Sequence, residues 1–130
     1  MNIKRLCLIA GLLSLPVTYA NAAEGITINV RVEVTNLPAA SQQVAVNCSV
    51  GVGAPSSGAY GWSEANLRSS GRAYIPGDVR NYSGDVRIQI REVTRPGRYL
   101  VDATHYKCVL FAFSGARLTG QNELNGVIPR

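Results

Sequence analysis

Apolar and polar residues alternate with a period of two along several short stretches of this chain. The clearest stretch runs from Ile26 to Val34, where every even-numbered residue is Ile or Val and every residue between them is polar. A second stretch, 44–52, repeats the pattern and places Cys48 among its apolar positions, and a third follows in "DVRIQIREV" at 85–93. This period is typical of strands that bury one face. We therefore predict three strands on these stretches.

The rest of the chain also favours short strands and turns. Residues 51–71 are rich in Gly, Ser and Ala, which predicts a loop around a short strand or turn near Tyr60 and Trp62. We expect a short strand in "RAYI" (72–75), one or two more in 98–113, and a terminal one in "LNGVI". No amphipathic helix of useful length is present. The pattern predicts an all-β domain, a small antiparallel β-sandwich, with a small closed β-barrel as the alternative.

The N-terminus has the features of a secretory signal peptide. Lys4 and Arg5 precede an apolar run that ends near Val17, and the small residues of 20–22 fit an A-x-A cleavage site. The run is too short to serve as a transmembrane anchor, which needs roughly 20 apolar residues. We expect residues 1–22 to be a signal peptide cleaved near Ala22 or Ala23, and 23–130 to be a single β domain, periplasmic or extracellular.

Export changes how the charges and cysteines are interpreted. Loss of the signal peptide lowers the net charge from +5 to about +3, so much of the basicity belongs to targeting. Two cysteines then remain, Cys48 and Cys108, in a chain sent to an oxidising compartment, and we expect them to form a disulfide. A zinc site would need further His or Cys ligands, and His105 is the one His of the chain.

The stretch "VDATHYKCVLFAF" (101–113) is the densest in candidate chemistry. If Cys108 points inward, Tyr106 and Leu110 share its face, and Phe111 and Phe113 lie on the opposite face. Apolar residues on both faces indicate a central strand that is covered on both sides, or one that carries an exposed patch.

Five of these residues resemble an immunoglobulin-type pattern. Cys48, Trp62, Asp102, Tyr106 and Cys108 follow the order of a domain in which a Trp packs on an inter-sheet disulfide and a Tyr two residues before the second Cys closes a tyrosine corner. The resemblance implies an immunoglobulin-like sandwich with one inter-sheet disulfide. It covers roughly the half of the chain between the two cysteines.

The sequence offers no catalytic, cofactor or metal motif. The glycines of 51–58 lack the final Gly of a dinucleotide loop and the Lys of a phosphate loop. Asp102 is three residues from His105, and residues an odd number apart on a strand face opposite ways, so the pair does not form part of a Ser-His-Asp triad. We expect no enzyme activity and no cofactor.

Arginines form the remaining group of candidate site residues, and their charge suggests an acidic partner. The candidate partner-binding residues are Arg87, Arg91, Arg95, Arg98, Phe111 and Phe113. Such a group suits a protein, an anionic glycan or a lipid headgroup, whereas nucleic acid would need interleaved aromatic residues. We predict a non-enzymatic binding or inhibitor module acting through a sheet face or loops. The alternative is a structural or assembly subunit of an envelope or pilus-like structure, in which residues 26–34 pair with a neighbouring sheet.

Overall fold

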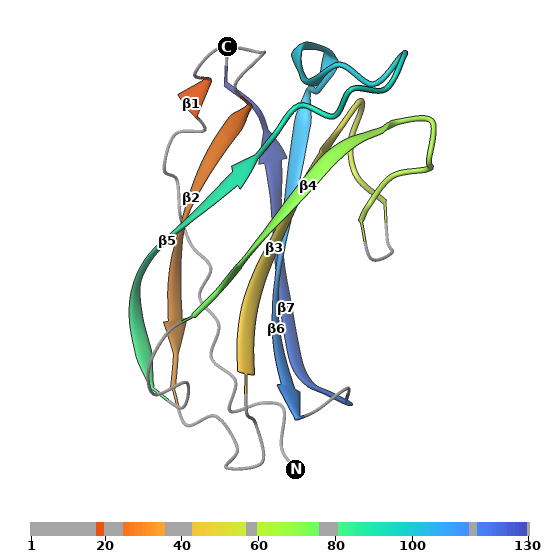
Figure 1. Cartoon of the computed structure of the whole chain (residues 1–130). Coiled ribbons are helices and arrows are strands. Elements are labelled where there is room, and N and C mark those ends of the chain that lie inside the picture. The colour runs from red at the N-terminus through yellow and green to blue at the C-terminus, as the bar shows by residue number, and fades with distance from the viewer. Residues whose placement is uncertain are drawn as a thin grey trace.

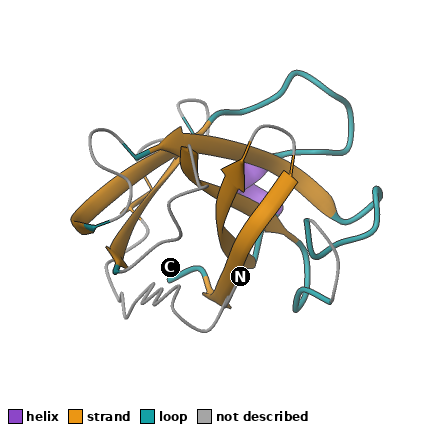
Figure 2. Cartoon of the chain, turned by 90° about the horizontal axis from the view of Figure 1, so that it is seen from below, coloured by secondary structure: helices purple, strands orange, loops and turns teal. Residues whose placement is uncertain are grey.

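The chain folds as two antiparallel sheets packed into a β-sandwich. The computed structural model describes residues 18–19, 25–35, 43–56, 60–75, 81–114 and 117–129. One sheet has the strand order β1-β2-β5 and the other β4-β3-β6-β7. Figure 1 shows β2 and β5 side by side next to the layer of β3, β6 and β7, and Figure 2 shows the strands from one end. The described strands do not close into a barrel, so the predicted sandwich is confirmed and the alternative of a closed barrel is wrong.

Seven strands and one short 3₁₀-helix make up the described part of the fold. Their bounds are β1 Thr18–Tyr19, β2 Ile26–Val34, β3 Gln43–Gly51, β4 Leu67–Tyr74, β5 Tyr82–Ile90, η2 Leu100–Asp102, β6 His105–Ser114 and β7 Arg117–Val127. The alternating residues of β2 and β5 bury one face each, as their period of two predicts. Together with the inward residues of β3 and β6 they form one apolar core.

Strand β4 is longer than its sequence indicates. It begins at Leu67, within the region expected to be loop, and "RAYI" covers only its end. None of its residues is fully buried, because β4 lies at the edge of its sheet and pairs only with β3. Its sequence therefore carries little alternation of apolar and polar residues, and its length depends on pairing with β3.

The disulfide joins two strands of the same sheet. Cys48 of β3 and Cys108 of β6 lie directly opposite each other in the antiparallel ladder, with their Cα atoms 4.0 Å apart. The predicted pairing is confirmed, but the inter-sheet position implied by the immunoglobulin resemblance is wrong. Both side chains point into the core as expected. Because β3 and β6 are neighbours, these inward side chains meet without crossing between the layers.

Among the described strands, β2 pairs with β5 along its whole length and with β1 only at its first two residues. Thr18 and Tyr19 of β1 pair with Thr27 and Ile26, within the segment predicted to be a signal peptide. Beyond Thr27, none of the described strands pairs with this edge of β2.

The two layers approach each other closely where β4 passes β5. The Ser69 hydroxyl donates to the Arg91 carbonyl at 3.0 Å. A Cβ atom on Gly71 would lie 2.6 Å from the backbone oxygen of Gln89, a separation too short for any side chain. Glycine at 71 therefore allows the sheets to meet along this side of the sandwich, which Figure 1 shows as β4 running across toward β5.

Candidate binding face on the four-stranded sheet

Strand β6 is central in its sheet, and its two faces have different surroundings. It pairs with β3 on one side and β7 on the other. Cys108 and Leu110 point into the core, with Tyr106 packed against it, as the sequence predicts. Burial raises the pKa of the Tyr106 hydroxyl. The odd-numbered residues of β6, which include Phe111 and Phe113, alternate with these and face outward from the sandwich.

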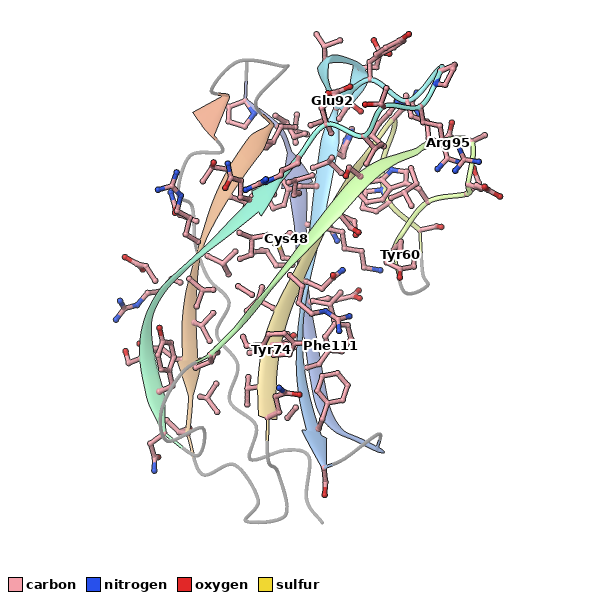
Figure 3. The ribbon with its side chains drawn as sticks, in the orientation of Figure 1. Cys48, Tyr60, Tyr74, Glu92, Arg95 and Phe111 are labelled. Carbon is pink, nitrogen blue, oxygen red and sulfur yellow. A yellow bond between two sulfur atoms is a disulfide. The ribbon has the colours of Figure 1, made fainter. Side chains whose placement is uncertain are left out.

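Four outward side chains gather on this sheet, and we call them the aromatic face: Arg72, Tyr74, Phe111 and Phe113. Tyr74 of β4 and Phe111 of β6 lie on either side of Ala45 of β3 in the strand register. Ala45 is fully buried although it points outward, because its larger neighbours cover it. Figure 3 shows Tyr74 and Phe111 close together on this sheet.

The rings of the aromatic face contact one another while remaining accessible. The centroids of Phe111 and Phe113 are 5.7 Å apart, within the range of favourable aromatic pairs. The Arg72 guanidinium carbon lies 5.9 Å from the Phe111 centroid, which allows a cation–π contact. Both Phe side chains are half-buried and Tyr74 is 54% exposed. The fold therefore covers the two Phe rings only in part.

A loop closes one end of this sheet face around a buried lysine. The Lys107 side chain is 3% exposed, and its ammonium contacts Glu123 Oε2 at 3.3 Å and donates to the Ser56 carbonyl at 3.2 Å. Gly61 of the same loop packs on the Lys107 stem so tightly that a Cβ atom there would lie 2.9 Å from its Cδ. Lys107 thus ties the β3–β4 loop to β6 and β7.

Substitution of Glu123 is expected to cost more stability than substitution of its partner Lys107. Glu123→Gln leaves the buried ammonium without its carboxylate, and we expect a loss of about 1–2 kcal/mol in the free energy of unfolding. Lys107→Met removes the charge and keeps an apolar stem, so its cost should stay below about 1 kcal/mol. Urea unfolding of the two variants measures the difference, and a larger loss for Lys107→Met would contradict this account.

Trp62 lies outside the core. Its ring packs over Gly51 on the outward side of β3, where an added Cβ atom would be 2.5 Å from the indole, and its Nε1 donates to the Gly53 carbonyl at 2.9 Å. It is therefore not packed on the disulfide, unlike the Trp of the immunoglobulin pattern. Tyr106, the Tyr of the same pattern, packs over Gly126 of β7 on the inner face of the sheet.

The predicted partner-binding residues occupy three separate places. Arg87 is exposed on the outward face of β5, and Arg91 directly follows that strand. Arg95 and Arg98 lie in the β5–β6 connection, where both contact Glu64 Oε1, at 3.6 and 3.1 Å. Phe111 and Phe113 belong to the aromatic face, on the other sheet from Arg87. The structure thus brings the two Phe residues together and leaves the arginines apart from them.

Sequence reasoning missed Arg72 and Tyr74 as members of the site. They alternate with Ala73 and Ile75, so the period of two already placed them on one face of a strand. What the sequence lacked was the register that sets this strand beside β3 and β6.

Candidate catalytic groups are sparse in the described ranges. The Thr104 hydroxyl lies 2.8 Å from His105 Nδ1 and also accepts from the Gly53 amide at 2.8 Å. Asp102 is exposed at the end of η2. Within the same residues, no group of three or more His, Cys, Asp or Glu side chains is placed to hold a metal ion.

The chain has a structural likeness to part of a solved enzyme. No family model matches the chain, and no curated protein matches its sequence. A β-glucuronidase from glycoside hydrolase family 2 aligns with 95% of this chain and 11% of its own, at 11% identity and a TM-score of 0.43. The chain therefore spans a small part of that enzyme's length. In the described residues, no helix has the length and apolar character needed to cross a membrane.

Proposed function

We propose that this protein is an exported, non-enzymatic binding module that holds a partner protein through the aromatic face. The observation that carries the proposal is the gathering of Arg72, Tyr74, Phe111 and Phe113 on one open sheet surface. Aromatic residues and Arg are enriched where protein interfaces concentrate their binding energy. The signal-like N-terminus and the disulfide support an exported protein.

The chemistry of this face defines the partner. Ala45 lies buried between Tyr74 and Phe111, so the accessible part of this face consists mainly of the larger side chains. Arg72 forms no ion pair with any residue that the structure describes. A complementary partner presents apolar side chains to the rings and a carboxylate to the Arg72 guanidinium.

A pull-down with matched variants tests the proposal. Wild type, Phe111→Ser/Phe113→Ser, and the control Arg87→Ser/Arg91→Ser are used as bait on extracts of the cell envelope. Loss of interface hot spots costs about 2 kcal/mol or more, so we expect recovery of a specific partner to fall about 30-fold for the Phe variant. The arginine variant should recover it as wild type does, because Arg87 lies on the other sheet.

Folding must be checked in the same experiment. An unchanged far-UV spectrum and an intact disulfide in the Phe variant would show that the loss concerns binding. Equal recovery by the folded Phe variant and wild type would refute a role for the aromatic face.

The short pairing of β2 with β1, among the strands that the structure describes, supports a second candidate function, that of an assembly subunit. The described strands leave the edge from Ile28 to Val34 unpaired, and main-chain hydrogen bonds from a neighbour could extend this sheet. Sedimentation of the mature protein at micromolar concentration separates the two proposals. A binding module should sediment as a monomer, and an assembly subunit should form larger species.

A further inference from the structure

An arginine-lined groove lies between the β5–β6 connection and the start of β4, away from the aromatic face. We call it the arginine groove; it has a volume of about 480 Å³. The residues that matter for its chemistry are Arg68, Ser69, Ser70, Thr94, Arg95 and Arg98. Figure 3 shows Arg95 near the end of the sandwich opposite to Tyr74 and Phe111.

Positive charge dominates this groove. Glu64 contacts both Arg95 and Arg98, so one carboxylate serves two guanidinium groups. Arg68 forms no ion pair with a described residue, and its Nη1 donates to the Ala65 carbonyl at 2.8 Å. Its Nε is the single buried side-chain nitrogen or oxygen left without a hydrogen bond in the described part of the chain. The three guanidinium groups and the Glu64 carboxylate carry a net charge of +2, and the Glu92 carboxylate of the adjoining hollow lowers this to +1.

Hydrogen bonds order the backbone of the β5–β6 connection beside the groove. The Glu92 carboxylate accepts a hydrogen bond from the Leu100 amide at 3.1 and 3.2 Å, which closes the β5–β6 connection on itself. The Arg98 amide donates to the Arg95 carbonyl at 3.1 Å, around Gly97 with its φ of 77°. The Arg98 side chain is only 17% exposed. Arg98 is therefore held in place by the fold, whereas the Arg95 side chain is 59% exposed.

An apolar hollow adjoins the groove and shares Val93, Thr94 and Arg95 with it. This second hollow has a volume of about 420 Å³ and is lined mainly by apolar side chains. Val93, Tyr99 and Val101 all contribute to it and are 42%, 54% and 49% exposed. Such exposure leaves apolar surface beside a concentrated positive charge.

We propose that this end of the sandwich binds an amphiphilic oxyanion, a phosphate or sulfate group that carries an apolar substituent. The anionic group lies in the arginine groove, where planar guanidinium groups donate paired hydrogen bonds to its oxygens. The apolar substituent covers Val93, Tyr99 and Val101. A small polar centre beside apolar walls is the usual composition of a ligand site. This site is separate from the aromatic face and does not depend on its role.

Calorimetric titration with three small probes tests the proposal: inorganic phosphate, phenyl phosphate and phenol. We expect phenyl phosphate to bind wild type at least about tenfold more tightly than either inorganic phosphate or phenol, since only phenyl phosphate uses both hollows. The variant Arg68→Gln/Arg95→Gln should bind phenyl phosphate at least about tenfold more weakly. The control Arg87→Gln, which changes a residue on β5 outside the groove, should bind phenyl phosphate as wild type does. Equal affinity for phenol and phenyl phosphate would overturn the proposal.

A second variant keeps the test valid if the arginine variant unfolds. Tyr99→Ser should reduce the affinity for phenyl phosphate to that for inorganic phosphate, while inorganic phosphate binds as in wild type. Unchanged binding of phenyl phosphate to this variant would overturn the role of the apolar hollow.

Co-sedimentation with vesicles identifies the source of the oxyanion. Vesicles of phosphatidylglycerol are compared with vesicles of phosphatidylcholine. Binding to the former alone, lost in Arg68→Gln/Arg95→Gln, assigns the site to a lipid headgroup. Binding of phenyl phosphate without binding of vesicles assigns it to a soluble ligand.

Discussion

Replacing both cysteines, as Cys48→Ala/Cys108→Ala, is expected to lower the free energy of unfolding by about 4 kcal/mol. The bond closes a loop across a sequence separation of 60 residues, and without it the unfolded chain gains the entropy of that loop. Both side chains are buried in the core, at 0% and 2% exposure, so their truncation adds a packing loss. Because domains of this kind have about 5–15 kcal/mol in total, the variant should be close to unfolding at physiological temperature.

Guanidinium chloride unfolding of the oxidised wild type, the reduced wild type and the double variant measures this effect. The reduced wild type should show a somewhat smaller loss than the double variant, since both lack the cross-link and only the variant also loses the buried sulfur atoms. Unchanged unfolding midpoints in both would disprove the stabilising role of the disulfide.

The Gly71→Ala substitution is expected to lower the free energy of unfolding by about 1–3 kcal/mol. The added methyl group would overlap the backbone oxygen of Gln89 at 2.6 Å and press on Ile88 Cγ2 at 3.2 Å. The clash with a backbone atom cannot be relieved by a change of rotamer, so β4 and β5 must move apart. Ile88→Val should therefore fail to rescue Gly71→Ala and should add its own cost of about 0.5–1.5 kcal/mol.

Urea unfolding of the single and combined variants tests this account. Ser70→Ala is the matched control, because Ser70 is the exposed neighbour of Gly71 on the same strand and its loss should stay within about 0.5 kcal/mol. Recovery of wild-type stability in the combined variant would show that the contact at Gly71 is a side-chain contact and not a backbone one.

Elements whose two faces differ in burial were predictable from the sequence. The strand Ile26–Val34 has the bounds that its alternation predicts, because one face is fully buried in the core and most residues of the other face are less buried. Strand β4 buries no residue fully, so its pattern is weak, and its first residues were expected to be loop. The disulfide lies within one sheet because β3 and β6 are neighbours. Strand order cannot be predicted from the local alternation of apolar and polar residues, so this position could not be predicted either.

In the candidate sites, too, only some of the residues could be predicted from the local sequence. Phe111 and Phe113 stand out in the sequence because apolar residues occupy both faces of one strand. Their companions Arg72 and Tyr74 come from a different strand and reach them only through the register across Ala45. The arginines were expected to act together, but Arg87 lies on the other sheet from the aromatic face, and Arg68 joins Arg95 and Arg98 from the start of β4. Local spacing did not determine these groupings, which follow from tertiary contacts.

The disulfide also determines which side of β6 carries the aromatic residues. Side chains on a strand alternate, so a slip of β6 by one residue against β3 would turn Phe111 and Phe113 inward and Leu110 outward. Cys48 and Cys108 are direct partners in that ladder, and the bond between them prevents such a slip. The disulfide on the inner face therefore fixes the register of β6 against β3. This register in turn determines that Phe111 and Phe113 lie on the outer face.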